Sequence, residues 1–195
     1  MNIEHNSNIY TFDGLDATGK TTLLNLFKQE NVKVVASPPD CIKQYRSDFD
    51  KEDLESRFLY YIFGNIWIDR NILKPSLDEN CPVLVDRSML TTLASHELRG
   101  LSEQYLEIGF NYAKTCIKPR TCYIIHVNKE ERFERLSKRV YFDEIDKQNL
   151  AFEETMEPKY QKWADRLGWN VLFFDNSGLT PKEAYQKLSR QILNH

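Results

Sequence analysis

The chain has 195 residues, 41% of them hydrophobic and 28% charged, which fits one globular domain, residues 1–195, with its own core. The formal net charge is −3, from 26 Lys+Arg against 29 Asp+Glu, and this balance argues against a surface built to bind a nucleic-acid backbone. No apolar run approaches the ~18 residues of a membrane helix, and the first residues form no apolar signal core, so we expect a cytoplasmic protein without a membrane partner.

Short apolar runs that end in polar loops alternate with longer helical patterns along the chain. Strands are predicted at Ile9–Asp13, Lys33–Ala36, Val83–Asp86, Cys122–Val127 and Val171–Asp175. Helices are predicted at 20–29, 53–73, 89–98, 102–114, 129–140, 149–166 and 182–194. Strands separated by helices imply a parallel sheet that is covered on both faces, so we predict a three-layer α/β sandwich with five parallel strands. Ligands of such sheets bind at the carboxyl ends of the strands.

The residues after the first strand form a phosphate-binding motif. Residues 14–21, Gly-Leu-Asp-Ala-Thr-Gly-Lys-Thr, match G-x-x-x-x-G-K-[ST] at every fixed position, between a predicted strand and a predicted helix. In that context backbone N–H groups bind phosphate oxygens, Lys20 neutralises the β and γ oxygens, and the Thr21 hydroxyl ligates Mg²⁺. The alternative is a strand–turn–helix corner with an incidental Lys-Thr pair. We predict a P-loop NTPase fold that binds ATP through Gly14, Asp16, Ala17, Thr18, Gly19, Lys20, Thr21 and Thr22.

A carboxylate and a guanidinium follow the third predicted strand, as Asp86 and Arg87. Arg87 offers a planar fork of donors that suits a phosphate, while Asp86 can hold Mg²⁺-bound water or orient Arg87. The alternative is an exposed Asp–Arg ion pair of little energetic consequence. Because the phosphate-binding motif and this pair lie at the same edge of the predicted sheet, we expect a second anion beside the triphosphate.

With these motifs in place, the sequence resembles the thymidylate kinase family, and most closely its UMP-CMP kinase branch of the mitochondrial type. The similarity runs through residues 12–22, Ser37-Pro38-Pro39, Arg46, and Asp86-Arg87 with Thr91-Thr92, and it continues more weakly to Tyr160. This resemblance implies ATP as donor with Mg²⁺, a nucleoside monophosphate as acceptor, and a homodimer formed through the helices that flank the third strand.

The resemblance also implies an acceptor site. Arg46 and Arg87 would grip the acceptor phosphate, Asp16 would accept a hydrogen bond from the sugar 3′-OH, and Tyr61 would stack on the base. Asn65 stands where thymidylate kinases commonly carry an arginine, and its amide could face uracil or cytosine by flipping. Each residue also has a purely structural alternative: Asp16 as a carboxylate that caps the following helix, Arg46 as a solvated loop charge, and Tyr61 as an aromatic of the core. The expected acceptor-binding residues are Asp16, Arg46, Tyr61, Asn65, Asp86, Arg87 and Thr91, and the expected metal ligands are Thr21 and Asp86.

A basic helix at 130–139, followed by residues 140–149, is similar to the lid that closes over the phosphates in the family. Thymidylate kinases usually carry a transition-state arginine in the P-loop or in the lid, but the two matching positions here are Ala17 and Glu144. We therefore expect Arg135, Arg139 or Lys147 to supply this charge, beside the catalytic residues Lys20 and Arg87. The alternative for Arg132, Arg135 and Arg139 is a solvated amphipathic helix, in which Glu131 pairs with Arg135.

These observations predict ATP-dependent phosphorylation of a pyrimidine nucleoside monophosphate: UMP or CMP, dUMP or dCMP, and as a further candidate dTMP. Two alternatives stay open. A deoxynucleoside kinase would need a general base near a free 5′-hydroxyl, and a non-catalytic nucleotide-binding protein would explain the uncharged positions at Ala17 and Glu144.

Overall fold

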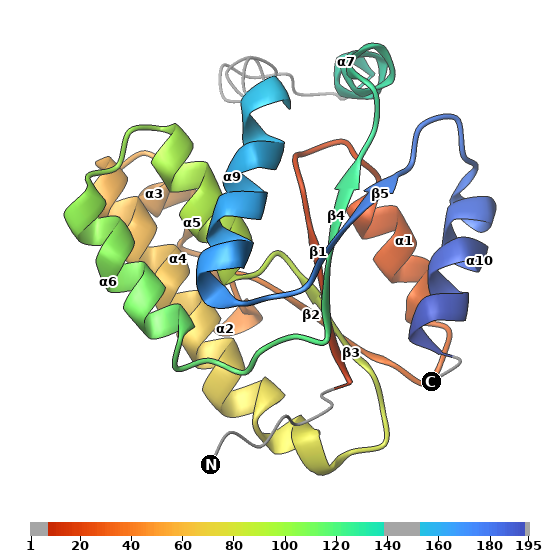
Figure 1. Ribbon diagram of the computed structural model, residues 1–195, viewed down its shortest axis with the longest axis horizontal. Coiled ribbons are helices and arrows are strands. Elements are labelled where there is room, and N and C mark those ends of the chain that lie inside the picture. Colours follow the sequence, from red (N-terminus) through yellow and green to blue (C-terminus); the bar gives the residue numbers. More distant parts are fainter. Residues whose placement is uncertain (1–7, 139–152, 194–195) are drawn as a thin grey trace.

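The chain folds around a five-stranded parallel sheet with the strand order β2-β3-β1-β4-β5 (Figure 1). The structure, a computed structural model, describes residues 8–138 and 153–193. The register pairs Ala36 of β2 and Phe12 of β1 with Asp86 of β3, so these strands end at the same edge of the sheet. The strands are β1 (Ile9–Asp13), β2 (Lys33–Ala36), β3 (Val83–Asp86), β4 (Thr121–His126) and β5 (Val171–Asp175).

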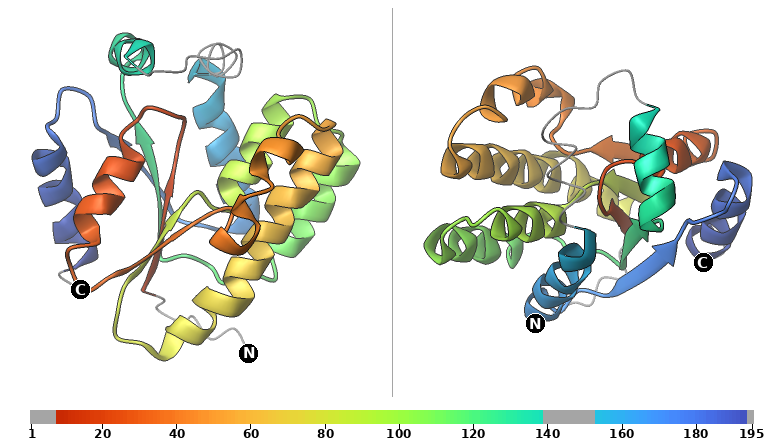
Figure 2. Two further views of the ribbon diagram at one scale, coloured as in Figure 1. Left: turned by 180° about the vertical axis from the view of Figure 1, so that it is seen from behind. Right: turned by 90° about the horizontal axis from the view of Figure 1, so that it is seen from above.

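Helices cover both faces of this sheet (Figure 2). Two lie on one face, α1 (Lys20–Phe27) and α10 (Pro181–Ile192). The opposite face is covered by α4 (Leu54–Ile68), α5 (Met89–Leu98), α6 (Glu103–Ala113) and α9 (Glu153–Leu167). Helix α7 (Lys129–Ser137) lies beyond the carboxyl end of β4 (Figure 1). The short elements are α2 (Asp40–Lys43), α3 (Arg46–Phe49), the π-helix η1 (Asp69–Leu73) and the 3₁₀-helix η2 (Pro75–Asp78).

Each face of the sheet has its own apolar core. On the α1 side, Leu23, Leu24 and Phe27 recur at helical spacing and pack against Phe12 and other buried strand residues. On the other side, helices α4, α5, α6 and α9 pack against Cys122 and Ile124 of β4. Strands with both faces covered read as continuous apolar runs, which is why β1 and β4 lack a strict alternation of apolar and polar residues.

The predicted three-layer α/β fold and its five parallel strands are confirmed. Four strands have the predicted bounds, and β4 begins and ends one residue earlier than predicted. The predicted helix 53–73 is wrong in its second part, because α4 ends at Ile68 and the chain continues as a π-helix. The two helices at 40–49 were not predicted, since four-residue helices are too short to show a period.

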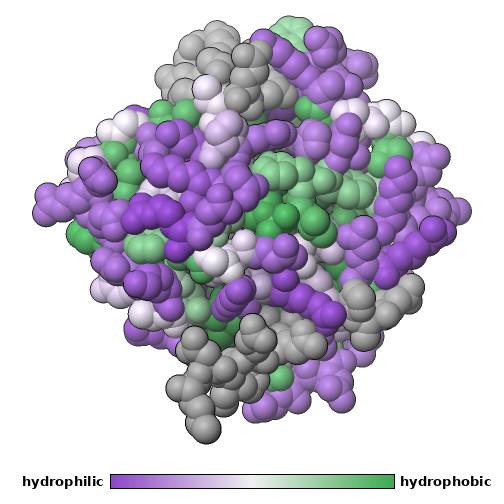
Figure 3. All heavy atoms as spheres, in the orientation of Figure 1, coloured by the Kyte–Doolittle hydropathy of each residue, from purple (hydrophilic) through white to green (hydrophobic). Residues whose placement is uncertain are grey.

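The sheet has two edges of different character. Figure 3 shows an apolar patch in the middle of a mostly hydrophilic face, at the place where edge strand β5 runs in Figure 1. Leu172 and Phe173 of β5 are exposed. Edge strand β2 instead lines a cavity with all four of its residues, together with Lys28 and Lys43. Within the described ranges 8–138 and 153–193, none of the helices combines the length and the apolar character that crossing a bilayer requires.

Candidate active site

The phosphate-binding motif forms a tight loop between β1 and α1, as predicted. Gly14, Ala17 and Gly19 have φ angles of 122°, 65° and 96°, in the region that favours residues without a bulky side chain. A Cβ atom on Gly14 would lie 2.3 Å from the carbonyl oxygen of Ile125, so only glycine fits between the loop and β4. The loop therefore has the open, left-handed turns that let successive N–H groups face one anion.

Lys20 is the buried cation of this loop. Lys20 is 5% exposed, and its ammonium donates to the carbonyl oxygen of Leu15 at 2.5 Å and to the Thr18 hydroxyl at 3.3 Å. Burial, together with the neighbouring charge of Arg87, lowers the pKa of Lys20 to about 7, against the opposing effect of nearby carboxylates. The Lys20 ammonium is thus held ready for a strongly anionic ligand that would restore its ordinary pKa.

Side chains from distant elements hold the outer side of the loop. The Tyr160 hydroxyl of α9 accepts a hydrogen bond from the Gly14 amide at 3.1 Å. Asn176, which follows β5, donates from Nδ2 to the carbonyl oxygen of Thr18 at 2.8 Å. These contacts tie the loop to α9 and to the end of β5.

Helix α7 adds two arginines to the same wall. Arg132 is 0% exposed, and its Nε donates to the carbonyl oxygen of Asp16 at 2.9 Å. Arg135 is paired with Glu131 at 2.5 Å, and its Nη1 lies 3.4 Å from the carbonyl oxygen of Ala17. The Glu131–Arg135 pair of the alternative interpretation is present, but Arg132 is not solvated as that alternative supposed, because the helix turns its side chain into the protein.

A carboxylate that the sequence reasoning passed over fixes the carboxyl end of β1. Asp13 is 0% exposed and accepts hydrogen bonds from the Ser88 amide at 2.8 Å and from the hydroxyls of Thr11 and Thr91, both at 2.6 Å. This network ties the P-loop to the N-terminus of α5. Thr91, a predicted acceptor-binding residue, lies in this buried network, where its hydroxyl is also 3.2 Å from that of Tyr160.

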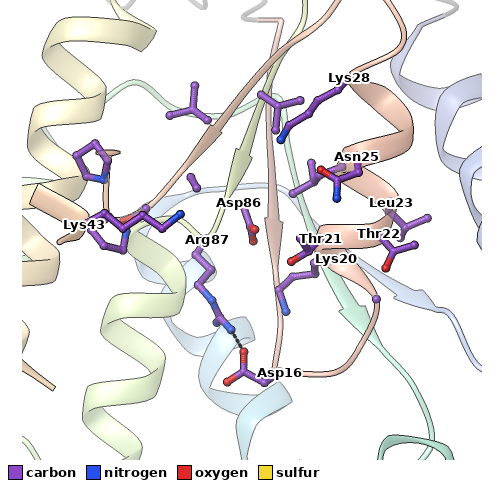
Figure 4. A pocket seen from close by; sticks show the side chains of 18 of the residues that line it. Asp16, Lys20, Thr21, Thr22, Leu23, Asn25, Lys28, Lys43, Asp86 and Arg87 are labelled. Carbon is purple, nitrogen blue, oxygen red and sulfur yellow. Dashed lines mark hydrogen bonds and ion pairs between the residues drawn. The ribbon is translucent and has the colours of Figure 1, made fainter. Parts of the chain in front are cut away.

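Arg87 links the P-loop to the end of β3. It adopts φ 67°, its Nη1 donates to the carbonyl oxygen of Gly14 at 3.2 Å, and its Nη2 pairs with the Asp16 carboxylate (Figure 4). Burial alone would lower the pKa of Arg87, but the carboxylates of Asp16 and Asp86 outweigh burial and raise it. The carboxylate that pairs directly with Arg87 is therefore that of Asp16, and Asp86 acts on Arg87 through its nearby charge.

A second cluster of charges forms around Asp50, between α3 and α4. Its carboxylate accepts from the Tyr61 hydroxyl at 3.0 Å and forms ion pairs with Arg57 at 3.0 Å and Arg46 at 3.4 Å. The Arg46 side chain is 48% exposed, so its guanidinium is accessible to a ligand. Of these four residues, only Arg46 and Tyr61 were predicted, since nothing in the sequence pattern shows that Asp50 and Arg57 meet.

Asn65 lies one turn beyond Tyr61 on α4 and is 8% exposed. Its Nδ2 donates to the carbonyl oxygen of Tyr61 at 2.9 Å and to the hydroxyl of Thr92 at 3.0 Å. The bond to the Tyr61 carbonyl would be lost if the amide flipped, because two oxygens would then face each other, whereas the Thr92 hydroxyl could bond to either end of the amide. Asn65 therefore has one preferred orientation, with Oδ1 as its free acceptor among the residues that the structure describes.

One cavity of about 1040 Å³ brings much of this machinery together. On the loop side it is lined by Lys20 and Thr21, and opposite them by Arg46 and Arg87. The carboxylate of Asp86 and the hydroxyl of Thr21 face the same part of the cavity (Figure 4). At the other end of the loop the lining residues are Arg135, Asn176, Leu179 and Pro181.

Arg46 and Arg87 thus line the same cavity as the phosphate-binding loop. Of the other predicted ATP-binding residues, Asp16, Ala17, Gly19 and Thr22 also line this cavity. Arg139 and the lid at 140–149, including Glu144 and Lys147, lie outside the described residues.

Comparisons with known proteins agree on one family. The family model described as thymidylate kinase matches residues 12–182. Human mitochondrial UMP-CMP kinase 2 is 30% identical over 165 residues, which cover 79% of this chain but only 36% of that protein. A thymidylate kinase from Sulfurihydrogenibium sp. (strain YO3AOP1) is 29% identical over 182 residues, 86% of this chain and 88% of that one. The crystal structure of thymidylate kinase from Ehrlichia chaffeensis superposes with a TM-score of 0.64 at 19% identity, covering 96% of this chain and 98% of that chain, which supports the fold.

Proposed function

The chain belongs to the thymidylate kinase family of nucleoside monophosphate kinases, and we propose that it transfers the γ-phosphoryl group of ATP to a pyrimidine nucleoside monophosphate. The acceptors we favour are UMP and CMP or their deoxy forms, with dTMP as a further candidate. The observation that carries this proposal is the single cavity in which Lys20 of the P-loop faces Arg46 and Arg87.

The charges opposite the P-loop fit a phosphate monoester. Arg46 and Arg99 each interact electrostatically with Arg87 and Tyr61, and Arg99 also interacts with Arg57. Arg46 and Arg87 line the cavity, and Arg57 and Arg99 lie within electrostatic range of one or both of them, together with the carboxylates of Asp16, Asp50 and Asp86. A phosphate monoester carries about −1.5 to −2 charges at neutral pH, so the guanidinium groups would attract it, whereas a neutral nucleoside offers them no charge.

On the donor side, the residues present fit Mg·ATP. Lys20 and the loop amides would hold the β- and γ-phosphates, and the side chains of Arg135, Asn176 and Leu179 leave room for the adenosine at the end of the cavity. Thr21 and Asp86 offer two oxygen ligands, which suits Mg²⁺ because this ion takes few protein ligands and keeps phosphates and water for the rest. When bound, Mg²⁺ would neutralise charge that develops on the transferred phosphoryl group.

The chain's own residues would then position the two phosphates for in-line transfer. Arg87 is held by Gly14 and Asp16 of the P-loop, so the group that grips the acceptor phosphate is fixed relative to the donor site. Such positioning and charge stabilisation are the main contributions a protein makes to phosphoryl transfer, since no covalent step is needed. The Asp16 carboxylate, which pairs with Arg87, is the acceptor that we propose for a sugar hydroxyl of the bound nucleotide.

Asn65 supports a pyrimidine acceptor. With Nδ2 bound to Tyr61 and Thr92, the side chain presents Oδ1, which accepts from the 4-amino group of cytosine or from N3–H of uracil. An arginine at this position would instead donate to the 4-oxo group. We therefore propose that Asn65 accommodates cytosine and uracil, the bases of the acceptors that we favour.

The exposed apolar side chains of α4 and α6 support a homodimer as part of the proposal. Leu59 and Phe63 on α4 and Ile108 and Tyr112 on α6 are all exposed, and the two helices pack against each other on one side of the molecule (Figure 1). A Phe63→Arg variant should sediment as a monomer where the parent protein sediments as a dimer. Cytoplasmic location stays a prediction.

The test of the proposed reaction is an acceptor screen with Mg·ATP, in which ADP release is measured with UMP, CMP, dUMP, dCMP, dTMP and AMP. We expect the pyrimidine monophosphates to be phosphorylated, and Lys20→Ala, which removes the P-loop ammonium, to abolish the rate. AMP as the best acceptor would refute the pyrimidine assignment. ATP binding without ADP release for any acceptor would favour the non-catalytic alternative.

A further inference from the structure

One end of the cavity is used by neither of the two proposed nucleotides. Beyond the P-loop and the acceptor arginines, the cavity runs along edge strand β2 and is lined by its residues Lys33–Ala36. Helix α1 contributes Lys28 to this end, α2 contributes Lys43, and α4 contributes Trp67. We call the space between these residues the β2 groove.

The β2 groove runs along the unpaired edge of the sheet. The amides of Lys33 and Ser37 donate toward β3, each to a carbonyl oxygen at 2.9 Å. Since successive residues of a strand direct their N–H and C=O groups to opposite sides, those of Val34 and Ala36 point away from β3. The part of the chain that the structure describes contains no strand beyond β2, so no neighbouring strand pairs these groups.

The walls of the β2 groove belong to the helical layers on the two faces of the sheet. Val34 packs with the core on the α1 side, whereas Val35 packs on the opposite face with Trp67 and Ile72. Lys28 of α1 and Trp67 of α4 both line the groove, so both layers extend past the edge of β2. The groove therefore has the place of one further strand, between two layers of helices.

The side chains of the β2 groove favour an anionic partner. Figure 4 shows Lys28 and Lys43 reaching into the cavity from opposite sides. Lys33, the third lysine of this lining, donates to the Ser76 hydroxyl at 3.0 Å, and Asp40 of α2 also lines the cavity. The chain as a whole has a net charge of −3, so this group of lysines is a local positive region that attracts and orients an acidic partner.

We propose that the β2 groove binds an extended acidic segment of a partner protein, which adds to the sheet as a strand beside β2. The backbone of this segment pairs with the N–H and C=O groups of Val34 and Ala36, and its carboxylates face Lys28 and Lys43. Side chains of a strand alternate between two faces, and Trp67 offers an apolar contact on the face opposite Lys28. The segment therefore alternates acidic and apolar residues.

A peptide titration with the whole 195-residue protein tests this proposal. The probe is a fluorescein-labelled octapeptide in which Glu and Val alternate, and its binding is followed by fluorescence anisotropy without nucleotide. One control peptide has Lys in place of Glu. A second control peptide is N-methylated throughout, which removes its backbone donors and leaves its charge. The variants are Lys28→Glu and Lys43→Glu, with Lys187→Glu on α10 as the matched control for net charge, and the melting temperature of each is measured.

We expect the Glu/Val peptide to bind and the Lys/Val peptide not to bind. Lys28→Glu and Lys43→Glu should each weaken binding about threefold or more, the double variant should weaken it further, and Lys187→Glu should have less effect. The N-methylated peptide should bind the parent protein about tenfold or more weakly than the Glu/Val peptide, because it cannot donate to the edge of β2.

Equal affinity for the N-methylated peptide would show attraction by charge alone and would overturn the proposed strand addition. Equal losses in all three single variants would place the peptide elsewhere on the protein. Absence of binding would also overturn the proposal and would leave the lysines the role of keeping an exposed sheet edge unpaired. If a lysine variant unfolds, the two peptides titrated into the parent protein still decide, and because no nucleotide is present the outcome is independent of the kinase reaction.

Discussion

ATP binding should depend on pH through Lys20. In the unliganded protein, burial lowers the pKa of this ammonium to about 7, so a large part of the molecules has a neutral Lys20 at pH 8. A bound triphosphate surrounds the same nitrogen with negative charge and restores its protonated form. Binding above pH 7 should therefore take up a proton.

The size of the effect follows from this pKa. If only the protonated form binds tightly, affinity should fall by about 50-fold between pH 7 and pH 9, with a limiting slope of about tenfold per pH unit. Proton uptake should be about half a proton at pH 7 and should approach one proton at pH 8.5. At high pH, affinity should level off at the value of a Lys20→Met variant, which has no ammonium.

Isothermal titration calorimetry with a non-hydrolysable ATP analogue and Mg²⁺ measures both quantities. Titrations in two buffers with different enthalpies of ionisation give the number of protons taken up, and Lys20→Met reports the contribution of all other groups. Zero proton uptake at pH 8, or an affinity that changes equally with pH in both proteins, would refute the proposed state of Lys20.

Three further predictions concern the scaffold of the site. Gly14→Ala should lower the free energy of unfolding by at least about 2 kcal/mol, because the new Cβ would meet the backbone of Ile125. Gly100→Ala, at a φ of 87° with open space around it, should lower it less in the same urea titration. Equal losses in the two variants would contradict the packing argument. Burial lowers the pKa of His96 to about 4, below its unfolded value of 6.5, so the neutral form stabilises the fold above pH 6.5 and this contribution is lost as pH falls toward 4. Relative to His96→Gln, the parent protein should therefore lose about 2–3 kcal/mol of unfolding free energy between pH 7.5 and pH 4.5. Parallel dependences of unfolding free energy on pH in the two proteins would contradict the lowered pKa of His96. Asp13→Asn should lower the free energy of unfolding by about 2 kcal/mol, since the Ser88 amide and the Thr11 and Thr91 hydroxyls all donate to this carboxylate. An unchanged midpoint in thermal or urea unfolding would show that the network contributes little.

The parts of the protein that were predicted correctly depend on local sequence. The strand–loop–helix order around residues 14–21 follows from a motif whose glycines have a geometric reason, and β1, β2, β3 and β5 are apolar runs bounded by polar loops. Arg87 could be placed at the sheet edge because the carboxyl ends of parallel strands meet there.

The parts that could not be predicted depend on contacts between distant segments. Asp13 is one more carboxylate at a strand end until the fold places Ser88 and Thr91 against it. Asp50 becomes the centre of a charge cluster only because the turn between α3 and α4 brings Arg57 back toward Arg46. Helical spacing alone put Arg132 and Arg135 on one face and could not show which of the two turns inward.

The account depends most on the claim that the guanidinium groups opposite the P-loop receive a phosphate. The direct measurement compares each nucleoside with its monophosphate, uridine with UMP and cytidine with CMP, as acceptors in the same Mg·ATP-dependent assay of ADP release. We predict turnover with the monophosphates and none above background with the nucleosides, and a large rise in the acceptor KM for Arg46→Ala. Phosphorylation of uridine or cytidine at rates equal to those of UMP or CMP would contradict the claim.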